Sequence, residues 1–267
     1  MTQSPVVSYD AVEEMAELYD HVPYYRERAD ISFYVRETRS IDGSVLELAS
    51  GTGRVLLPIA RAAKRVVGVE RSEQMIERCR EKLADEPDDV RALVTLHAGD
   101  MRDFELGEQF GAVIIPFRPM QHLLTIDDQL ACLTAARRHL APGGRLIFDV
   151  FNPDFRRIGS PVEGEFDDTP DTPLSDGRSF RRTGRIVQTL WVEQVNDIEL
   201  IYHITHMSGD VERRVHEIRM RWYTRAELEH LLARAGFQVE TIYGDFDREA
   251  LSDRSREMII VASPGNS

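Results

Sequence analysis

Cysteine is scarce in this chain, and long apolar runs are absent from it. Of 267 residues only Cys79 and Cys132 are cysteine, both in helix-like sequence, so they form neither a disulfide framework nor a metal-ligand cluster. No apolar run approaches the roughly 20 residues that span a bilayer. The first ten residues lack the basic and apolar regions of a secretory signal. We therefore expect a cytoplasmic protein with no metal ion and no membrane partner.

Positive charge is also in short supply. Lys and Arg number 33 against 46 Asp and Glu, which gives a formal net charge of −13. Such a surface repels phosphate backbones, so nucleic acid is a poor candidate partner. The segment 178–225 is the exception, because its nine Arg and six acidic residues give a net +3. An anionic group of a substrate could bind in that segment.

Apolar strands and helix-like runs alternate over the first 150 residues. Strands are expected at 44–49, 65–70, 92–98, 110–117 and 145–151. Helices are expected at 55–63, at 72–83 and from Thr125 to the stop signal Pro142-Gly143-Gly144. Ser72 and Thr125 are plausible N-caps. Because the strands are continuous apolar runs, they indicate a parallel sheet covered on both faces, in a doubly wound α/β fold.

The pattern changes after residue 153. Residues 154–184 are rich in Pro, Gly and Asp, which predicts a long loop. Three antiparallel strands are expected at 185–194, 198–207 and 215–223, with turns at 195–197 and 208–210. A helix with a capping box (Thr224 and Glu227) and Gly236 after its end should follow. Two last strands are expected at 237–243 and 258–262.

The glycine turn in V-L-E-L-A-S-G-T-G-R (Val45–Arg54) lacks two features of phosphate sites. No Lys follows Gly51 and Gly53, which excludes a P-loop. A dinucleotide turn needs a third glycine, where this chain has Leu56. S-adenosylmethionine carries no phosphate and remains a candidate. Glu70, 19 residues after Gly51, could accept from the ribose hydroxyls, and Asp100 from the adenine amino group.

Each of these side chains also has a purely structural interpretation. Glu70 could be a solvated acid that caps the helix after it, and Asp100 could cap the turn M-R-D-F. Met75 could lie on the adenine face or in the core. The residues alone leave these alternatives open.

Five segments together resemble the class I S-adenosylmethionine-dependent methyltransferases. They are E-L-A-S-G-T-G-R, V-V-G-V-E-R-S-E-Q-M-I, H-A-G-D-M-R-D-F, F-G-A-V-I-I-P-F-R-P-M-Q-H-L and H-L-A-P-G-G-R-L-I-F-D-V-F-N-P, within about residues 15–153. In the family pattern E/D-x-G-x-G-x-G, Ala49 replaces the first glycine, which is a mild departure. The resemblance implies a Rossmann-like fold of seven mostly parallel strands, the last one antiparallel.

The resemblance also implies where the cofactor binds. Glu47 would lie near the methionine ammonium, Glu70 on the ribose, Asp100 and Met101 at adenine, and Phe117 with Gln121 near the sulfonium. The full set of expected cofactor residues is Tyr19, Glu47, Ala49, Gly51, Gly53, Arg54, Glu70, Arg71, Met75, Gly99, Asp100, Met101, Phe117 and Gln121.

The N-terminal segment Y-D…D-I-S-F-Y-V-R-E and the strand insertion after the fifth strand resemble the small-molecule branch of the family, which includes glycine and amino-sugar N-methyltransferases. We expect an N-terminal helical lid (1–40), a cofactor domain (41–153 and 224–267) and an antiparallel insertion (154–223) that roofs the substrate pocket or forms a homodimer contact. The N-terminal tyrosines could close over the site or simply pack the helices.

The predicted reaction is methyl transfer to an amine or hydroxyl of a small molecule by direct displacement. His122 is the candidate general base, needed only if the nucleophile arrives protonated; it could equally be a helix-start histidine bonded to backbone. Candidate substrate residues are Tyr25, Trp191, Arg219 and Arg221, against the alternatives of core packing and a solvated or salt-bridged face. A non-methylating catalyst and a cofactor-binding scaffold are the rival functions.

Overall fold

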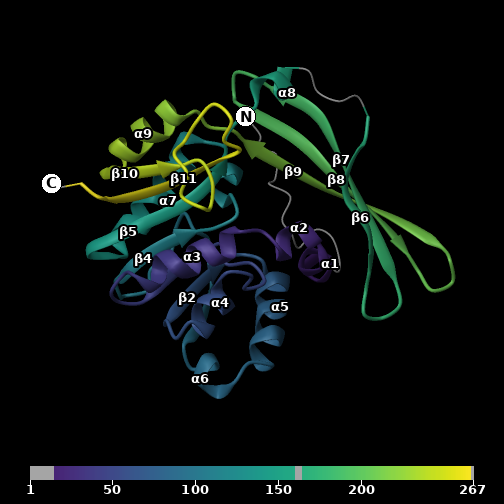
Figure 1. Cartoon of the computed structure of the whole chain (residues 1–267), viewed down its shortest axis with the longest axis horizontal. Helices are drawn as coiled ribbons and strands as arrows, with labels where there is room; N and C mark the ends of the chain where they lie inside the picture. The colour runs from purple at the N-terminus through teal and green to yellow at the C-terminus, as the bar shows by residue number, and fades with distance from the viewer. Residues whose placement is uncertain (1–14, 160–163, 266–267) are drawn as a thin grey trace. The chain divides into compact units, whose positions relative to one another are not determined.

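The computed structural model describes residues 15–159 and 164–265, and they form two compact units (Figure 1). The insertion unit combines the chain up to Arg28 with Asp154–Arg221. The Rossmann unit combines Ala29–Pro153 with the chain from Trp222 onward. The predicted lid (1–40) is therefore split between the two units, because its residues after Arg28 belong to the Rossmann unit. The first 14 residues, which are the start of the predicted helical lid, lie outside the described residues.

The Rossmann unit is built on a seven-stranded sheet, as predicted. Its order is β10 (Phe237–Tyr243), β11 (Glu257–Pro264), β5 (Leu140–Phe151), β4 (Phe110–Ile115), β1 (Val45–Leu48), β2 (Val66–Glu70) and β3 (Val94–Ala98). β1 lies in parallel between β2 and β4, while β11 is antiparallel to both of its neighbours. The last strand is therefore the antiparallel one, which the family resemblance implied.

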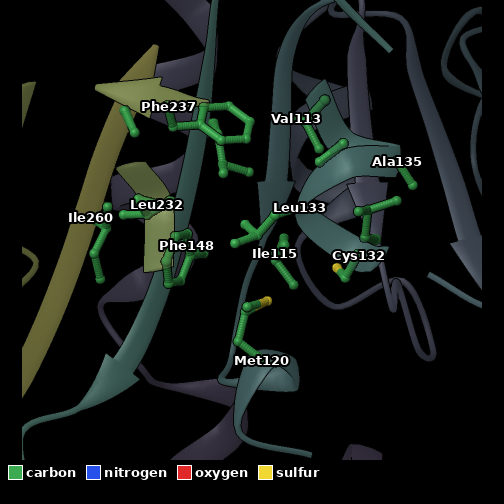
Figure 2. Packing of buried hydrophobic residues seen from close by; sticks show 14 of the residues in the cluster. Val113, Ile115, Met120, Cys132, Leu133, Ala135, Phe148, Leu232, Phe237 and Ile260 are labelled. Atoms are coloured by element: carbon green, nitrogen blue, oxygen red, sulfur yellow. The ribbon is translucent and has the colours of Figure 1, made fainter. Parts of the chain in front are cut away.

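Helices cover both faces of this sheet. They are α3 (Asp30–Arg39), α4 (Leu56–Arg61), α5 (Glu73–Ala84), α6 (Asp88–Arg91), the 3-10 helix η2 (Pro119–His122), α7 (Ile126–Arg138) and α9 (Arg225–Arg234). Leu46 and Ile115 belong to one buried cluster, which side chains of α7 and α9 join (Figure 2). Val45 and Ile114 belong to a second cluster with α3 and α4. Neighbouring residues of one strand, such as Val45 and Leu46, thus belong to different clusters. The sheet therefore has a buried core on each face, as a parallel sheet requires.

The predicted helix N-caps are confirmed, but the predicted end of the helix that starts at Thr125 is wrong. Ser72 Oγ accepts from Met75 N–H at 3.2 Å, and Thr224 and Glu227 form the capping box. The predicted helix from Thr125 ends at Arg138, well before the expected stop at Pro142-Gly143-Gly144. That tripeptide lies within β5, which begins at Leu140 and pairs with β4. These three residues lie in the register shift between the pairs Phe110–Leu140 and Ala112–Arg145, and Gly143 has φ +77°, so they form an irregularity within the strand and do not end the helix.

The insertion unit contains a four-stranded antiparallel sheet. Its order is β6 (Phe166–Pro173), β7 (Ser179–Leu190), β8 (Val195–Thr205) and β9 (Val211–Arg221), with α1 (Met15–His21), α2 (Pro23–Arg26) and α8 (Phe155–Gly159) in the same unit. The antiparallel insertion after the fifth strand is thus confirmed.

Two details of the predicted insertion are wrong. The loop expected at 154–184 contains β6 and the start of β7. Prolines are tolerated in β6 because it is an edge strand, where a missing N–H breaks no ladder. The turn expected at 195–197 is at 191–194 instead, because Leu190 pairs with Val195. Asn196 and Asp197 are strand residues despite their turn preference.

Both cysteines are buried and free of disulfides in the described structure. Burial raises the pKa of Cys132 to about 12, so this thiol is unreactive at neutral pH. None of the described helices is long and apolar enough to cross a membrane.

Candidate active site

The glycine turn follows β1 at the centre of the sheet, where β1 is flanked by β2 and β4. Crevices at this place in doubly wound sheets bind ligands at the carboxyl ends of the strands. Gly51 has φ +55° and Gly53 φ +79°. A methyl group built on Gly51 meets no atom within 4 Å, whereas one on Gly53 lies 2.6 Å from Cys79 Sγ. Gly51 therefore borders open space, while Gly53 allows the turn to pack on α5.

Ala49 precedes them with φ +54°. This left-handed conformation costs an L-residue roughly 1–2 kcal/mol, which a glycine would avoid. The turn thus adopts at Ala49 the left-handed conformation that a glycine favours, and the alanine carries a small strain at the site.

Glu70 holds the turn by its carboxylate. Oε2 accepts from Gly51 N–H at 2.9 Å, and Oε1 accepts from Arg71 N–H and Ser72 N–H, both at 2.8 Å. Burial raises the pKa of Glu70, and these backbone donors partly offset the rise. Three of about four lone-pair positions of the carboxylate are occupied. The cap interpretation therefore describes part of its role, and a position for a ligand hydroxyl remains.

Glu47 is a buried acid in the middle of the site. It is 2% exposed and its Oε2 has no hydrogen-bond partner in the described structure. Desolvation raises the pKa of Glu47 well above its ordinary value, although the Arg54 guanidinium works against the rise. A buried carboxylate oxygen of this kind requires a donor. The ammonium of a methionine moiety is a donor of the required charge, so the residue fits the expected cofactor.

Arg54 is fixed by an acid that sequence reasoning did not select. Its two terminal nitrogens donate to Asp30 Oδ1 at 2.8 Å and Oδ2 at 2.6 Å. Asp30 is fully buried. The guanidinium also lies 4.6 Å from the centre of the Phe117 ring. A bidentate pair over an aromatic face is a rigid arrangement, and nothing in the spacing of residues 30, 54 and 117 announces it.

Asp100 is already engaged by arginine. Its Oδ1 accepts from Arg102 N–H and Nε, both at 2.9 Å, and its Oδ2 accepts from Arg102 at 2.7 Å. Burial alone would raise the pKa of Asp100, but Arg102, with Arg71 at 3.8 Å, holds that pKa below its usual range. Asp100 thus caps the turn M-R-D-F through the Arg102 N–H, as its structural interpretation predicts. Its contact with adenine stays a prediction.

The neighbouring candidates are partly committed to the core. Met75 is 3% exposed on α5, and Met101 packs against the first core cluster. Gly99 donates its N–H to Glu70 O at 2.8 Å, which joins the ends of β3 and β2. Their contacts with adenine remain predictions.

The loop after β4 carries three further candidates. Phe117 has φ +67° and its N–H donates to Asp149 Oδ1 at 2.8 Å. Gln121 is fully buried in η2 and accepts from Phe151 N–H at 3.0 Å, so it braces the end of β5. His122 is half-buried at the end of η2. Its role as a base stays a prediction.

The predicted substrate residues all belong to the insertion unit. Arg219 donates to Asp197 at 2.7 Å. Arg221 donates to Glu193 O at 2.5 Å and to Gln194 at 3.1 Å, at the β7–β8 turn. These contacts are those of the salt-bridged alternative. Trp191 is 54% exposed in the same turn, so it does not fill the core.

Tyr25 of α2 packs against the insertion sheet, and Tyr19 of α1 packs against Tyr25. The rings of Tyr19 and Tyr25 lie 4.8 Å apart. The buried Arg182 guanidinium lies 4.9 Å from the Tyr25 ring and donates to Tyr202 at 3.0 Å. Tyr19 thus belongs to the insertion unit, and its predicted cofactor contact stays a prediction.

Comparisons with known proteins find methyltransferases, both by sequence and by fold. Residues 45–144 match the family described as methyltransferase domain. The dTDP-3-amino-3,6-dideoxy-alpha-D-glucopyranose N,N-dimethyltransferase of Streptomyces fradiae is 29% identical over 255 residues, covering 91% of this chain and 90% of that protein. The cypemycin N-terminal methyltransferase of a Streptomyces species is 28% identical, covering 87% and 88%. The CcbJ methyltransferase structure from Streptomyces caelestis superposes with a TM-score of 0.75 at 26% identity, covering 94% and 96%.

Proposed function

Since this chain is a class I S-adenosylmethionine-dependent methyltransferase, we propose that it methylates the amine of a small molecule. The first candidate for this acceptor is a nucleotide-linked amino sugar. The observation that carries the proposal is the extent of the similarity. The methyltransferase domain ends at residue 144, but the similarity to the amino-sugar enzyme covers 91% of the chain. It therefore includes most of the insertion as well as the cofactor turn.

The cofactor supplies a methyl group activated by a sulfonium. The residues of this chain would bind and orient the cofactor, with Glu47 at its ammonium and Glu70 at its ribose. The open space beside Gly51 would let the cofactor approach the backbone of the turn. A neutral amine has its own lone pair, so displacement needs a positioned and desolvated nucleophile more than a base. His122 would act only on an amine that arrives protonated.

Substrate recognition would come from the insertion unit. Arg219 and Arg221 lie two residues apart on β9, so they share a face of the sheet. A diphosphate would compete with Asp197 for Arg219, because arginine binds phosphate in the same forked geometry as carboxylate. Acceptor binding would then weaken as salt concentration rises.

A second candidate is the terminal amine of a peptide. The cypemycin N-terminal methyltransferase covers nearly as much of this chain as the amino-sugar enzyme does. Both candidates share an amine acceptor. A hydroxyl acceptor and a non-methylating reaction are less favoured, because both of these relatives are named N-terminal or N,N-dimethyl transferases.

The test is an acceptor panel with purified protein and S-adenosylmethionine. It contains a dTDP-amino sugar, the same sugar with hydroxyl in place of the amine, and a short peptide with a free terminus. We expect S-adenosylhomocysteine release and a mass gain of one or two methyl groups on the amino sugar alone. Methylation confined to the hydroxyl sugar would overturn the amine assignment, and methylation confined to the peptide would select the second candidate. Light scattering of the same preparation tests the predicted homodimer.

A further inference from the structure

Two consecutive residues after β4 adopt a backbone conformation that favours glycine, although neither is glycine. Phe117 has φ +67° and Arg118 has φ +71°. Such residues persist only where their surroundings impose the conformation, and they cluster at functional sites. The loop therefore has to be held by contacts that lie outside it.

One of these contacts is a buried acid on β5. Asp149 is fully buried within the apolar run R-L-I-F-D-V-F. Its Oδ1 accepts from Phe117 N–H at 2.8 Å and from the Tyr34 hydroxyl at 2.7 Å. On the other side of the loop, Arg118 donates to Glu257 at 2.5 Å. The strained pair is thus fixed at both residues.

Helix α3 supports the arrangement at two points. Asp30 and Tyr34 are four residues apart, so they share one helix face. Asp30 holds the guanidinium of Arg54, which covers the Phe117 ring at 4.6 Å. Tyr34 holds Asp149, which holds the Phe117 backbone. The ring and the backbone of Phe117 are therefore both fixed, through separate residues, by the same helix.

We propose that Asp149 is a positioning residue for methyl transfer, which acts by holding the Phe117–Arg118 loop in its left-handed conformation with Tyr34 as its support. The proposal rests on the proposed function, in which Phe117 lies near the reacting sulfur. Asp149 acts without touching the cofactor or the acceptor. Its effect on the reaction passes through the position of Phe117.

The first test needs no methyl acceptor. Hydrogen exchange is measured on peptides that cover residues 116–123, in the wild type and in Asp149→Ala. We expect exchange in this segment to become at least tenfold faster, because the Phe117 N–H loses its acceptor, with β1 and β2 unchanged. Glu108→Gln removes an exposed carboxylate from its pair with Arg65 and is the matched control. Uniform acceleration over the sheet, or none at all, would overturn the proposal.

Milder variants separate the hydrogen bonds from general destabilisation. Asp149→Asn keeps an acceptor oxygen for Phe117 and Tyr34, so we expect its exchange to fall between those of the wild type and Asp149→Ala. Tyr34→Phe removes only the supporting hydroxyl and should produce a smaller acceleration in the same segment. Because these two variants preserve side-chain shape, they test the proposal even where Asp149→Ala does not fold. Exchange in Tyr34→Phe that equals the wild type would contradict the supporting role.

The second test concerns the reaction. For Asp149→Ala we expect kcat to fall by about tenfold or more, since small misplacements at a reacting centre have effects of this size, while the Kd for S-adenosylhomocysteine changes far less. An unchanged kcat with a loosened loop would refute the catalytic consequence. If the wild type methylates no acceptor while binding S-adenosylhomocysteine, the proposed function fails, and the exchange experiment still decides whether Asp149 holds the loop.

Discussion

Substitution of the two turn glycines by alanine should separate ligand approach from internal packing. In Gly51→Ala the new methyl group meets no protein atom within 4 Å, so the folded state is destabilised only by the left-handed conformation at φ +55°. The left-handed conformation costs roughly 1–2 kcal/mol. The lower entropy of the unfolded chain returns about 0.4–1 kcal/mol. We expect Gly51→Ala to lose about 1 kcal/mol of unfolding free energy.

Gly53→Ala adds a steric conflict to the same backbone strain. Its methyl group would lie 2.6 Å from the buried Cys79 Sγ and 3.2 Å from Leu57 Cγ. Overpacking of this kind typically costs about 1–3 kcal/mol. The total loss should therefore be about 2–4 kcal/mol. Adding Cys79→Ala should recover part of it, because the contacting sulfur is gone.

The assays are urea unfolding and calorimetric titration with S-adenosylhomocysteine. Gly51→Ala should shift the urea midpoint slightly with an unchanged m-value. It should also weaken S-adenosylhomocysteine binding by tenfold or more, since the methyl group occupies the open space beside the turn. Gly53→Ala should show the larger midpoint shift. Wild-type affinity in Gly51→Ala, or a stability loss exceeding that of Gly53→Ala, would refute the interpretation of this turn.

Three further outcomes are expected. Burial raises the pKa of Glu47 in the folded protein above its pKa in the unfolded chain. The contribution of Glu47 to the free energy of unfolding is therefore fully present below the unfolded-state pKa, and it is lost as the pH rises through the folded-state pKa. Glu47→Gln should therefore unfold at higher urea than the wild type at pH 8, with the difference shrinking toward pH 4, while binding S-adenosylhomocysteine more weakly. Phe117→Ala should lower kcat in the acceptor assay, and unchanged kinetics would assign the ring to packing. Arg219→Ala should raise the KM for an anionic acceptor and cost less than about 1 kcal/mol in unfolding, because its pair with Asp197 is partly exposed; an unchanged KM would leave Arg219 a structural residue.

Sequence reasoning succeeded where the signal is local. The apolar runs predict the parallel sheet, and short polar caps such as Ser72 and Thr224 lie next to the helices they start. It failed at β6, whose Pro170 and Pro173 are typical of loops and are tolerated because the strand is an edge. The turn at 191–194 was missed because W-V-E-Q contains no Gly, Pro, Asn or Asp.

The same distinction applies to the candidate site. Residue type and spacing select Gly51 and Glu70, whereas Glu47 is selected by the resemblance to the family pattern that begins at this acid. The pairs Asp30–Arg54 and Tyr34–Asp149 join residues 24 and 115 positions apart. No periodicity encodes such contacts, because they depend on where α3 packs. A lone acid within the apolar run R-L-I-F-D-V-F was the one available signal for Asp149.

The buried Glu47 carboxylate has a consequence for how binding responds to the buffer. Its raised pKa means that the free protein holds a proton there over part of the pH range in which an unperturbed glutamate would be ionised. An ammonium placed against this carboxylate favours the ionised form. If the ammonium of a methionine-type tail binds there, as proposed, loading the ligand would release protons. The measured heat would then depend on the ionisation enthalpy of the buffer, and the affinity would rise with pH until Glu47 of the free protein is already ionised.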